Sequence, residues 1–204
     1  MATLIRFADL TPAPWANGLG STTEIARGIG SGRLDSGGAD RGGADWDWRI
    51  SVATIEAATP FSALPGVDRV LMALGPDPLT LMVEGKQHDL QPQETLQFSG
   101  EDDVRPVGVD TPGRDVNLMT RRGAFHGSLH LTRIRNGLTV GSTPGTRVAL
   151  ILLEGAGVVA QEGETAPTLQ LGPLGTLLGD PGEPMTLLGA ATYAQVTLWP
   201  ANTV

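Results

Sequence analysis

Polar and apolar positions alternate along residues 115–123, which is the pattern of a β-strand with two different faces. Asn117, Met119 and Arg121 share one face, and a leucine and a threonine stand between them. A guanidinium presents a fork of donors that matches the geometry of a carboxylate. The segment is therefore interpreted as an anion-binding wall inside a barrel. An outer face with solubilising charge is the alternative that this segment alone leaves open.

A second segment of the same kind spans residues 46–55. Arg49 and Ser51 fall on one face of it, and Ile50 and Val52 fall on the other. This arrangement predicts a sheet that has a core on one side and a pocket on the other. The two tryptophans of this segment are predicted to cap a core or to flank the mouth of that pocket, with core packing as the default.

Two stretches of chain, residues 69–101 and 147–180, follow the same plan. Each opens with Arg-Val and continues through a Gly turn, a second strand and a Leu-Gln step to a turn of Gly with an acid. Such self-similarity predicts one supersecondary unit that occurs twice, with chance similarity between Gly-rich β segments as the alternative. We expect a first unit over residues 1–136, including the N-terminal motif strands, and a second over 137–204. Packing of the two into one compact globule is left open.

The composition favours many short strands. The chain of 204 residues contains 28 Gly and 15 Pro, which interrupt it every few residues, and helix signals are weak throughout. Repeated strand–turn–strand units of this kind build double-stranded β-helix barrels of the jelly-roll and cupin type. The expected fold is all-β, with two cupin-like units in one chain. Residues 28–43 are rich in Gly, Ser and Asp without apolar periodicity and are interpreted as a flexible loop.

Charge and targeting signals exclude several classes of function. The formal net charge is −8, whereas a general nucleic-acid binder carries a basic excess. Cysteine is absent, which excludes disulfides, thiolate metal sites and a cysteine nucleophile. Neither a signal peptide nor an apolar run of membrane-spanning length is visible, so we expect a cytoplasmic protein that binds no membrane.

The three histidines, His88, His126 and His130, argue against a metal site. A cupin metal site needs two histidines one residue apart, so that both rings point inward from one strand. His126 and His130 are four residues apart, a spacing that brings ligands together on a helix but not on a strand. We therefore expect no metal and no cofactor. A nucleophile elbow and a phosphate loop with its lysine are also missing from the sequence.

Two further segments contain turns next to polar residues. Asn17 and Gly18 predict a turn with positive backbone angles, whose peptide N–H groups can face an anion. A Pro-Gly turn at residues 65–66 precedes Asp68 and Arg69 at the start of the next strand. Arg69 either serves a pocket or forms an exposed ion pair, which would contribute little.

Taken in order, these segments resemble the HutD/Ves family of bicupin proteins, best over residues 3–130. The resemblance implies a double cupin barrel without the usual metal ligands. It also implies an accessory or regulatory link to histidine utilisation in bacteria, which suits a small carboxylate such as urocanate, formylglutamate or formate. The matching residues are Trp15, Asn17, Gly18, Gly20, Thr23, Glu24 and Ile25, then 48–51, then 60–62 with Pro65, Gly66, Asp68 and Arg69, and finally 117–119 with Arg121, Arg122 and Gly123.

The leading hypothesis is a metal-free protein that senses or sequesters a small carboxylate. Arginine side chains would hold the carboxylate, amide and hydroxyl groups would add hydrogen bonds, and apolar side chains would line the remainder. The candidate ligand-binding residues are Trp15, Asn17, Thr23, Glu24, Arg49, Ser51, Phe61, Asp68, Arg69, Asn117, Met119 and Arg121.

Two other classes of function stay open at this point. The first is an enzyme for a small acidic or sugar-like substrate, with Glu24 or Asp68 as a general base beside an arginine. The second is a protein-interaction module with the arginines on an outer face. A homodimer is compatible with either class, but no sequence feature fixes the assembly.

Overall fold

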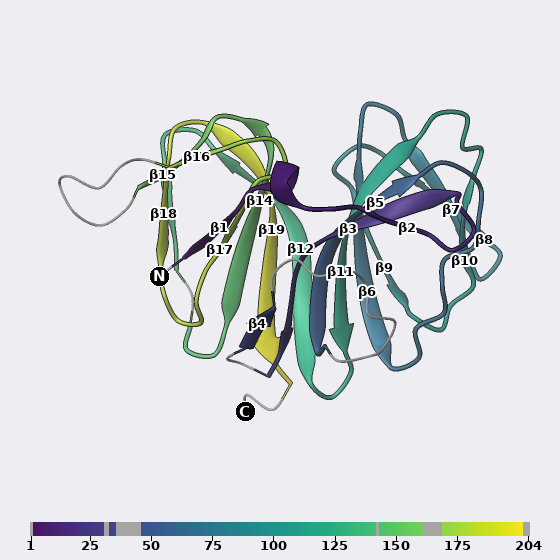
Figure 1. Cartoon of the computed structure of the whole chain (residues 1–204), viewed down its shortest axis with the longest axis horizontal. Coiled ribbons are helices and arrows are strands. Elements are labelled where there is room, and N and C mark those ends of the chain that lie inside the picture. The colour runs from purple at the N-terminus through teal and green to yellow at the C-terminus, as the bar shows by residue number, and fades with distance from the viewer. Residues whose placement is uncertain (1, 31–32, 36–45, 142, 161–168, 202–204) are drawn as a thin grey trace.

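The computed structural model describes the chain except for residues 1, 31–32, 36–45, 142, 161–168 and 202–204. Its described part is almost entirely β-strand and forms two lobes side by side (Figure 1). The single helical turn within it is η1 (Phe7–Asp9). Across the described residues, no helix is long and apolar enough to cross a membrane.

The first lobe is built from a large and a small antiparallel sheet. The large sheet has the strand order β2-β3-β5-β11-β6-β9, with β4 added on β3, and the small sheet has the order β10-β7-β8. The strands of this lobe are β2 (Ala13–Pro14), β3 (Gly20–Ile29), β4 (Arg33–Asp35), β5 (Trp48–Ile55), β6 (Val67–Leu74), β7 (Leu79–Val83), β8 (Lys86–Leu90), β9 (Thr95–Ser99), β10 (Val104–Val107) and β11 (Gly113–Arg121).

The second lobe repeats this plan with a large sheet β1-β17-β14-β19-β12 and a small sheet β13-β18-β15-β16. Its strands are β1 (Thr3–Ile5), β12 (Phe125–Ile134), β13 (Leu138–Val140), β14 (Arg147–Gly155), β15 (Gly157–Ala160), β16 (Leu169–Leu171), β17 (Thr176–Leu178), β18 (Met185–Leu188) and β19 (Ala191–Pro200).

The strand order confirms the internal repeat. The run β5-β11-β6-β9 in the first large sheet corresponds to β12-β19-β14-β17 in the second, and β10-β7-β8 corresponds to β18-β15-β16. Each lobe is thus a double-stranded β-helix barrel, and the all-β bicupin fold expected from the sequence is confirmed. The division at residues 136/137 stays a prediction. Two strands that precede it, β1 and β12, pair with β17 and β19 in the second large sheet.

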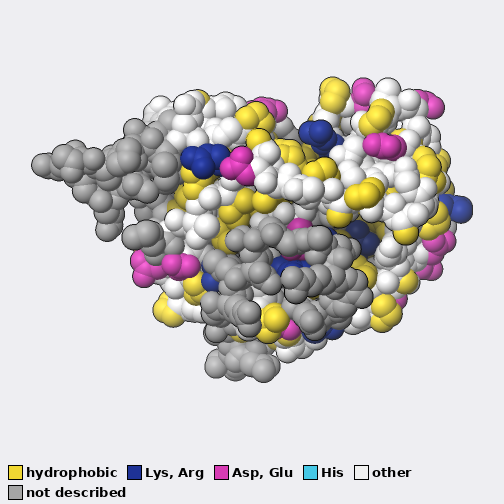
Figure 2. Space-filling view, in the orientation of Figure 1, with side chains coloured by type: hydrophobic (Ala, Val, Ile, Leu, Met, Phe, Trp, Pro, Cys, Tyr) yellow, Lys and Arg dark blue, Asp and Glu magenta, His cyan; other side chains and the backbone are white. Residues whose placement is uncertain are grey.

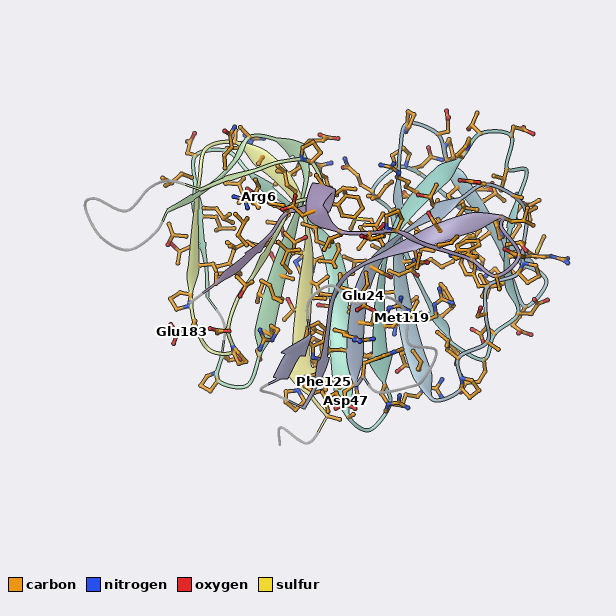
Figure 3. All side chains as sticks on the ribbon, in the orientation of Figure 1. Arg6, Glu24, Asp47, Met119, Phe125 and Glu183 are labelled. Carbon is orange, nitrogen blue, oxygen red and sulfur yellow. The ribbon has the colours of Figure 1, made fainter. Side chains whose placement is uncertain are left out.

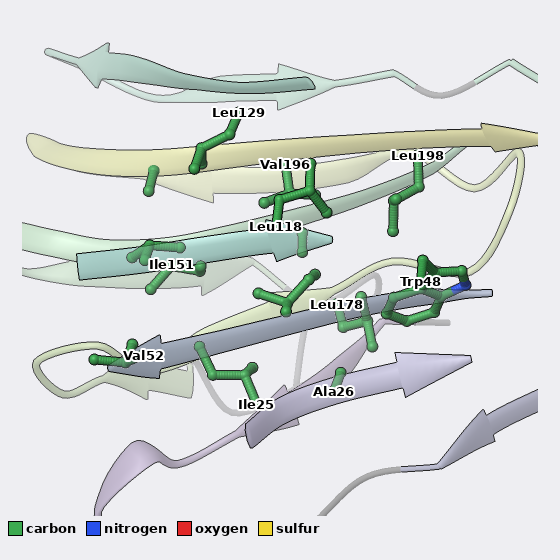
Figure 4. Close-up of a cluster of buried hydrophobic side chains, with 14 of the residues drawn as sticks. Ile25, Ala26, Trp48, Val52, Leu118, Leu129, Ile151, Leu178, Val196 and Leu198 are labelled. Atoms are coloured by element: carbon green, nitrogen blue, oxygen red, sulfur yellow. The ribbon is translucent and has the colours of Figure 1, made fainter. Parts of the chain in front are cut away.

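The two large sheets pack against each other and share one hydrophobic core (Figure 4). Trp48, Ile50 and Val52 enter this core from β5, and Val196 and Leu198 enter it from β19. Because side chains alternate along a strand, the residues between these positions face the inside of their own barrel. The shared core therefore fixes which residues of β5, β6 and β11 can line a cavity.

The Gly-rich stretch 28–43 differs from its expected form where the structure describes it. Gly28 and Ile29 extend β3, and residues 33–35 form β4, which pairs back onto β3. A Cβ at Gly28 would lie 2.5 Å from the Trp48 ring, so the glycine allows the indole to pack against the strand. The expectation of a flexible loop is therefore wrong for these residues, and residues 36–43 lie outside the described part.

Candidate functional site

A cavity of about 930 Å³ lies on the inner face of the first large sheet. Its floor consists of side chains from β5, β6 and β11, and its rim consists of residues 13–17 and 60–65. Figure 3 labels Met119 on β11, which lines the cavity, and Glu24 on β3, which contacts a neighbouring arginine of the floor.

The strand register sets arginine and asparagine side chains in rows across the floor. Met119 on β11 stands between Arg49 on β5 and Arg69 on β6, because it is the cross-strand partner of both. In the next row, Asn117 stands beside Ser51, and one row further Asp115 stands between two alanines. The predicted strand is confirmed for residues 115–121, whereas residues 122–123 form a turn. Asn117, Met119 and Arg121, which were predicted to share one face, line the cavity together.

Arg69 is buried, with only 6% of its surface exposed, and is held by contacts with two rings and an amide. Its guanidinium carbon lies 5.0 Å from the ring centres of both Phe61 and Phe98, which is cation–π geometry on two rings. Its NH2 group donates to Asn117 Oδ1 at 3.1 Å, while its Nε has no hydrogen-bond partner among the described residues. Burial lowers the pKa of Arg69 to about 10, an effect that Asp115 opposes and Arg49 reinforces, so the guanidinium remains charged at neutral pH.

Asp115 is the most deeply buried acid of the cavity, with 0% exposure. Its Oδ1 accepts a hydrogen bond from Asn117 Nδ2, and its Oδ2 has no partner in the described structure. Burial raises the pKa of Asp115 to about 7, and the charge of Arg69 and the backbone of Ala53 limit this rise. The floor thus contains a carboxyl group that can change its charge near neutral pH.

Glu24 on the neighbouring strand β3 contacts Arg49. Arg49 Nε lies 2.9 Å from Glu24 Oε2, a close charge contact without the alignment of a good hydrogen bond. Arg27 Nε lies 3.5 Å from the other oxygen of Glu24. A bulge between Glu24 and Ala26 turns both Glu24 and Arg27 toward the inner face of β3.

The rim is held by hydrogen bonds among its own residues. Asn17 donates to Thr59 Oγ1 at 3.0 Å and accepts from the backbone N–H of Leu19, so its amide joins two loops. Trp15 Nε1 donates to Thr22 Oγ1 at 2.9 Å. At the other side of the mouth, Arg121 donates to the backbone oxygen of Trp46 and lies over its ring.

The structure places most of the candidate residues together, and it separates three from the cavity. Thr23 and Asp68 fall on the opposite strand faces, where Thr23 is buried and Asp68 is bound to Arg122 at 2.7 Å. Glu24 contacts Arg49 beside the cavity but is not among the residues that line it. The candidates that line it are Trp15, Asn17, Arg49, Ser51, Phe61, Arg69, Asn117, Met119 and Arg121.

Several residues at the cavity were not among the candidates, and three of them contact the charged side chains or extend the lining. Asp115 lies two positions before Asn117, so extending the alternation by one step would have found it. Trp46 also precedes a candidate on its own segment. Phe98 comes from β9, and its contact with Arg69 depends on strand pairing that no local pattern reveals.

Metal ligands do not gather in the part of the chain that the structure describes. No group of three or more His, Asp or Glu side chains there is placed to hold an ion. His126 instead lies beside the Trp199 ring, at 6.1 Å between ring centres.

The fold and the cavity together define a bicupin with an arginine-lined pocket in its first barrel. The chain belongs to the HutD family, whose model matches residues 7–196. Among curated proteins, a 21.2 kDa protein in the hutC 3′ region of Pseudomonas putida is 37% identical over 117 residues, which are 57% of this chain and 56% of that protein. Protein Ves of Cronobacter sakazakii is 34% identical over 58% of this chain and 61% of its own length. The matched part thus spans little more than half of these relatives.

Solved structures extend the similarity over the whole length. HutD from Pseudomonas fluorescens SBW25, in a formate condition, has a TM-score of 0.75 and 25% identity, covering 99% of this chain and 100% of that one. A cupin 2 conserved barrel domain protein from Leptotrichia buccalis has a TM-score of 0.56 at 9% identity, covering 97% of this chain and 96% of its own. This second likeness shows the fold alone.

Proposed function

We propose that this protein binds a small carboxylate in the cavity of its first barrel and acts as an accessory or regulatory component linked to histidine catabolism. The observation that carries the proposal is Arg69, a buried guanidinium fixed between two phenyl rings, with an Nε donor that no described residue uses. A buried cation aimed into a cavity favours an anionic ligand, because water does not screen the attraction there.

The other classes of function receive less support. Glu24 is engaged with Arg49 and Arg27, and Asp68 is engaged with Arg122, so both proposed general bases are committed to ion pairs. The arginines of an interaction module would face outward. Arg69 is instead buried, and Figure 2 shows the exposed charged side chains of this face scattered over both lobes.

The relatives suggest which acids to try first. The HutD structure in a formate condition makes formate the simplest probe, and the cavity of about 930 Å³ leaves room for larger acids such as urocanate and formylglutamate. A cavity of this size is in the range of small-molecule sites, roughly 300–1,000 Å³.

The test is a thermal-shift measurement with formate, urocanate and formylglutamate. A ligand at a hundredfold excess over its Kd stabilises the folded state by about 2.7 kcal/mol, which raises the melting temperature by about 5–10 °C in a chain of this size. The variants Arg49→Gln and Arg69→Gln should lose this shift. Arg105→Gln, which removes an exposed arginine of the same barrel, should keep it. A melting temperature that none of the acids changes would contradict the proposal.

A further inference from the structure

The cavity contains a carboxylate of its own, next to the cation that an incoming anion would use. We propose that Asp115 is an internal counter-ion of Arg69 that a bound carboxylate replaces, so that the site takes up its ligand together with one proton, which Asp115 carries. This inference rests on the proposed function, since it requires a carboxylate at Arg69.

The contacts connect the two groups through one side chain. Arg69 NH2 donates to Asn117 Oδ1, and Asn117 Nδ2 in turn donates to Asp115 Oδ1. Asn117 therefore orients both ends, because an amide can accept at its oxygen while it donates at its nitrogen. At the two ends of this series of hydrogen bonds, the donor Arg69 Nε and the acceptor Asp115 Oδ2 have no hydrogen-bond partner within the described residues.

Few other charges face Asp115. The charge that acts on it comes from Arg69 on β6. The other arginine of the floor, Arg49 on β5, is already in contact with Glu24 on β3. On its own strand, Arg121 lies at the mouth near Trp46. The small sheet contributes apolar side chains to the adjacent cluster, among them Leu81. Asp115 thus depends on Arg69 as its main compensating charge.

A ligand carboxylate bound at Arg69 would raise the free energy of ionised Asp115, so that Asp115 would take up a proton. Two carboxylates that share one buried cation repel each other, and such pairs hold a proton between them. The pKa of Asp115 is already raised to about 7 by burial, so Asp115 can accept a proton near neutral pH. Ordinary carboxylic acids have pKa values near 4, so the proton resides on Asp115 and the ligand stays ionised. The balanced process is one anion and one proton taken from solution, with no bond broken.

The sign of the pH dependence follows from linkage. Above pH 7 the free protein has Asp115 ionised, so binding requires proton uptake and the affinity falls by up to about tenfold per pH unit. Between about pH 5 and 6 Asp115 is already protonated before the ligand arrives, so the affinity is almost independent of pH.

The experiment is calorimetric titration of the full chain with formate and with whichever acid gives the largest thermal shift. At each of pH 8 and pH 6, two buffers with different enthalpies of ionisation are compared, which gives the number of protons taken up. We expect close to one proton at pH 8 and close to none at pH 6. Asp115→Asn, which keeps the shape and the hydrogen bond to Asn117, should bind without proton uptake and with a flat pH profile. Arg105→Gln should behave like the natural chain.

The outcomes separate the two proposals. Binding by the natural chain without proton uptake at pH 8 would overturn the role of Asp115 and leave the carboxylate site standing. If the folded natural chain bound none of the acids at any pH, both the carboxylate site and the role of Asp115 would be contradicted. Because the decisive measurement uses the natural chain, it does not depend on whether Asp115→Asn folds.

Discussion

The two barrels share a common strand order in their sheets, but their interiors differ in polarity. In the second barrel the inner positions of β14 are Val148, Leu150 and Leu152, which pack into an apolar cluster with Tyr193. In the first barrel the inner positions of three adjacent strands include Arg49, Arg69, Asp115 and Asn117. The first barrel therefore combines a polar cavity with an apolar cluster that includes Leu71 and Leu81, whereas the described interior of the second barrel is an apolar cluster. This difference depends on a few inward-facing positions.

The arginines at the start of β6 and β14 show how finely this difference is set. Arg69 and Arg147 open the two halves of the repeat, yet Arg69 faces its barrel and Arg147 faces the core between the large sheets. There Arg147 lies 5.9 Å from the ring centre of Trp48 and donates to the backbone oxygen of Gly179. Since side chains alternate with a period of two, a shift by one residue converts a ligand-facing cation into a structural one.

The comparison implies that the second barrel contributes more to stability and the first more to binding. Burial of polar and charged groups costs free energy unless each is paired, and Asp115 and Arg69 each retain an unpaired atom. Proteins commonly accept such a cost where a site requires it. Four predictions test this division, in order of decreasing expected effect on stability.

The largest effect is expected from the interior of the second barrel. Leu150→Ala removes a side chain with 0% exposure and should lower the free energy of unfolding by about 2–5 kcal/mol, because a cavity remains. Urea unfolding measures this. A change at a polar inner position of the first barrel, Ser51→Ala, should cost less than about 1 kcal/mol. Equal losses at both positions would contradict the contrast between the barrels.

A smaller effect is expected from removal of the cation in the first barrel. Arg69→Met leaves Asp115 without its main compensating charge and should destabilise the protein by about 2–3 kcal/mol at pH 8. At pH 6 the loss should be smaller, because Asp115 is then protonated. The double variant Arg69→Met/Asp115→Asn should recover most of the loss at pH 8 by urea unfolding. No recovery would mean that the two groups are not coupled.

The pH dependence of stability provides the third prediction. The pKa of Asp115 is about 7 in the folded state, raised by burial from an ordinary value near 4, so the folded state binds the extra proton between these values. Stability should therefore fall as the pH rises from 5.5 to 8, by about 2 kcal/mol, and level off above. Unfolding curves of Asp115→Asn, compared at each pH, should lack this component. A difference that stays constant from pH 5.5 to 8 would argue that Asp115 does not titrate there.

The alternation of side chains along a strand explains how much of the site could be predicted from the sequence. The faces of β5 and β11 were predictable because Arg49 and Asn117 each stand in a clean alternation. Pairs of neighbours such as Asp68 and Arg69 cannot both face one cavity, so only one of the two candidates could be correct. The pairing of β1 and β12 with strands of the second large sheet could not be predicted from the sequence. Alternation identifies the faces of a strand but not its pairing partners.

The smallest effect is expected at Asp68, which lies near the start of β6 on the face that is turned away from the cavity. Asp68 is partly exposed and bound to Arg122, which also contacts Glu101, and this group of charges lies at the surface. Exposed ion pairs contribute little, so Asp68→Asn should change the melting temperature by less than about 2 °C. The carboxylate-induced thermal shift should remain unchanged, because this side chain points away from the cavity. If Asp68→Asn abolished that shift while the protein stayed folded, the acid would belong to the site, and the assignment of binding to the cavity-facing side of β6 would be wrong.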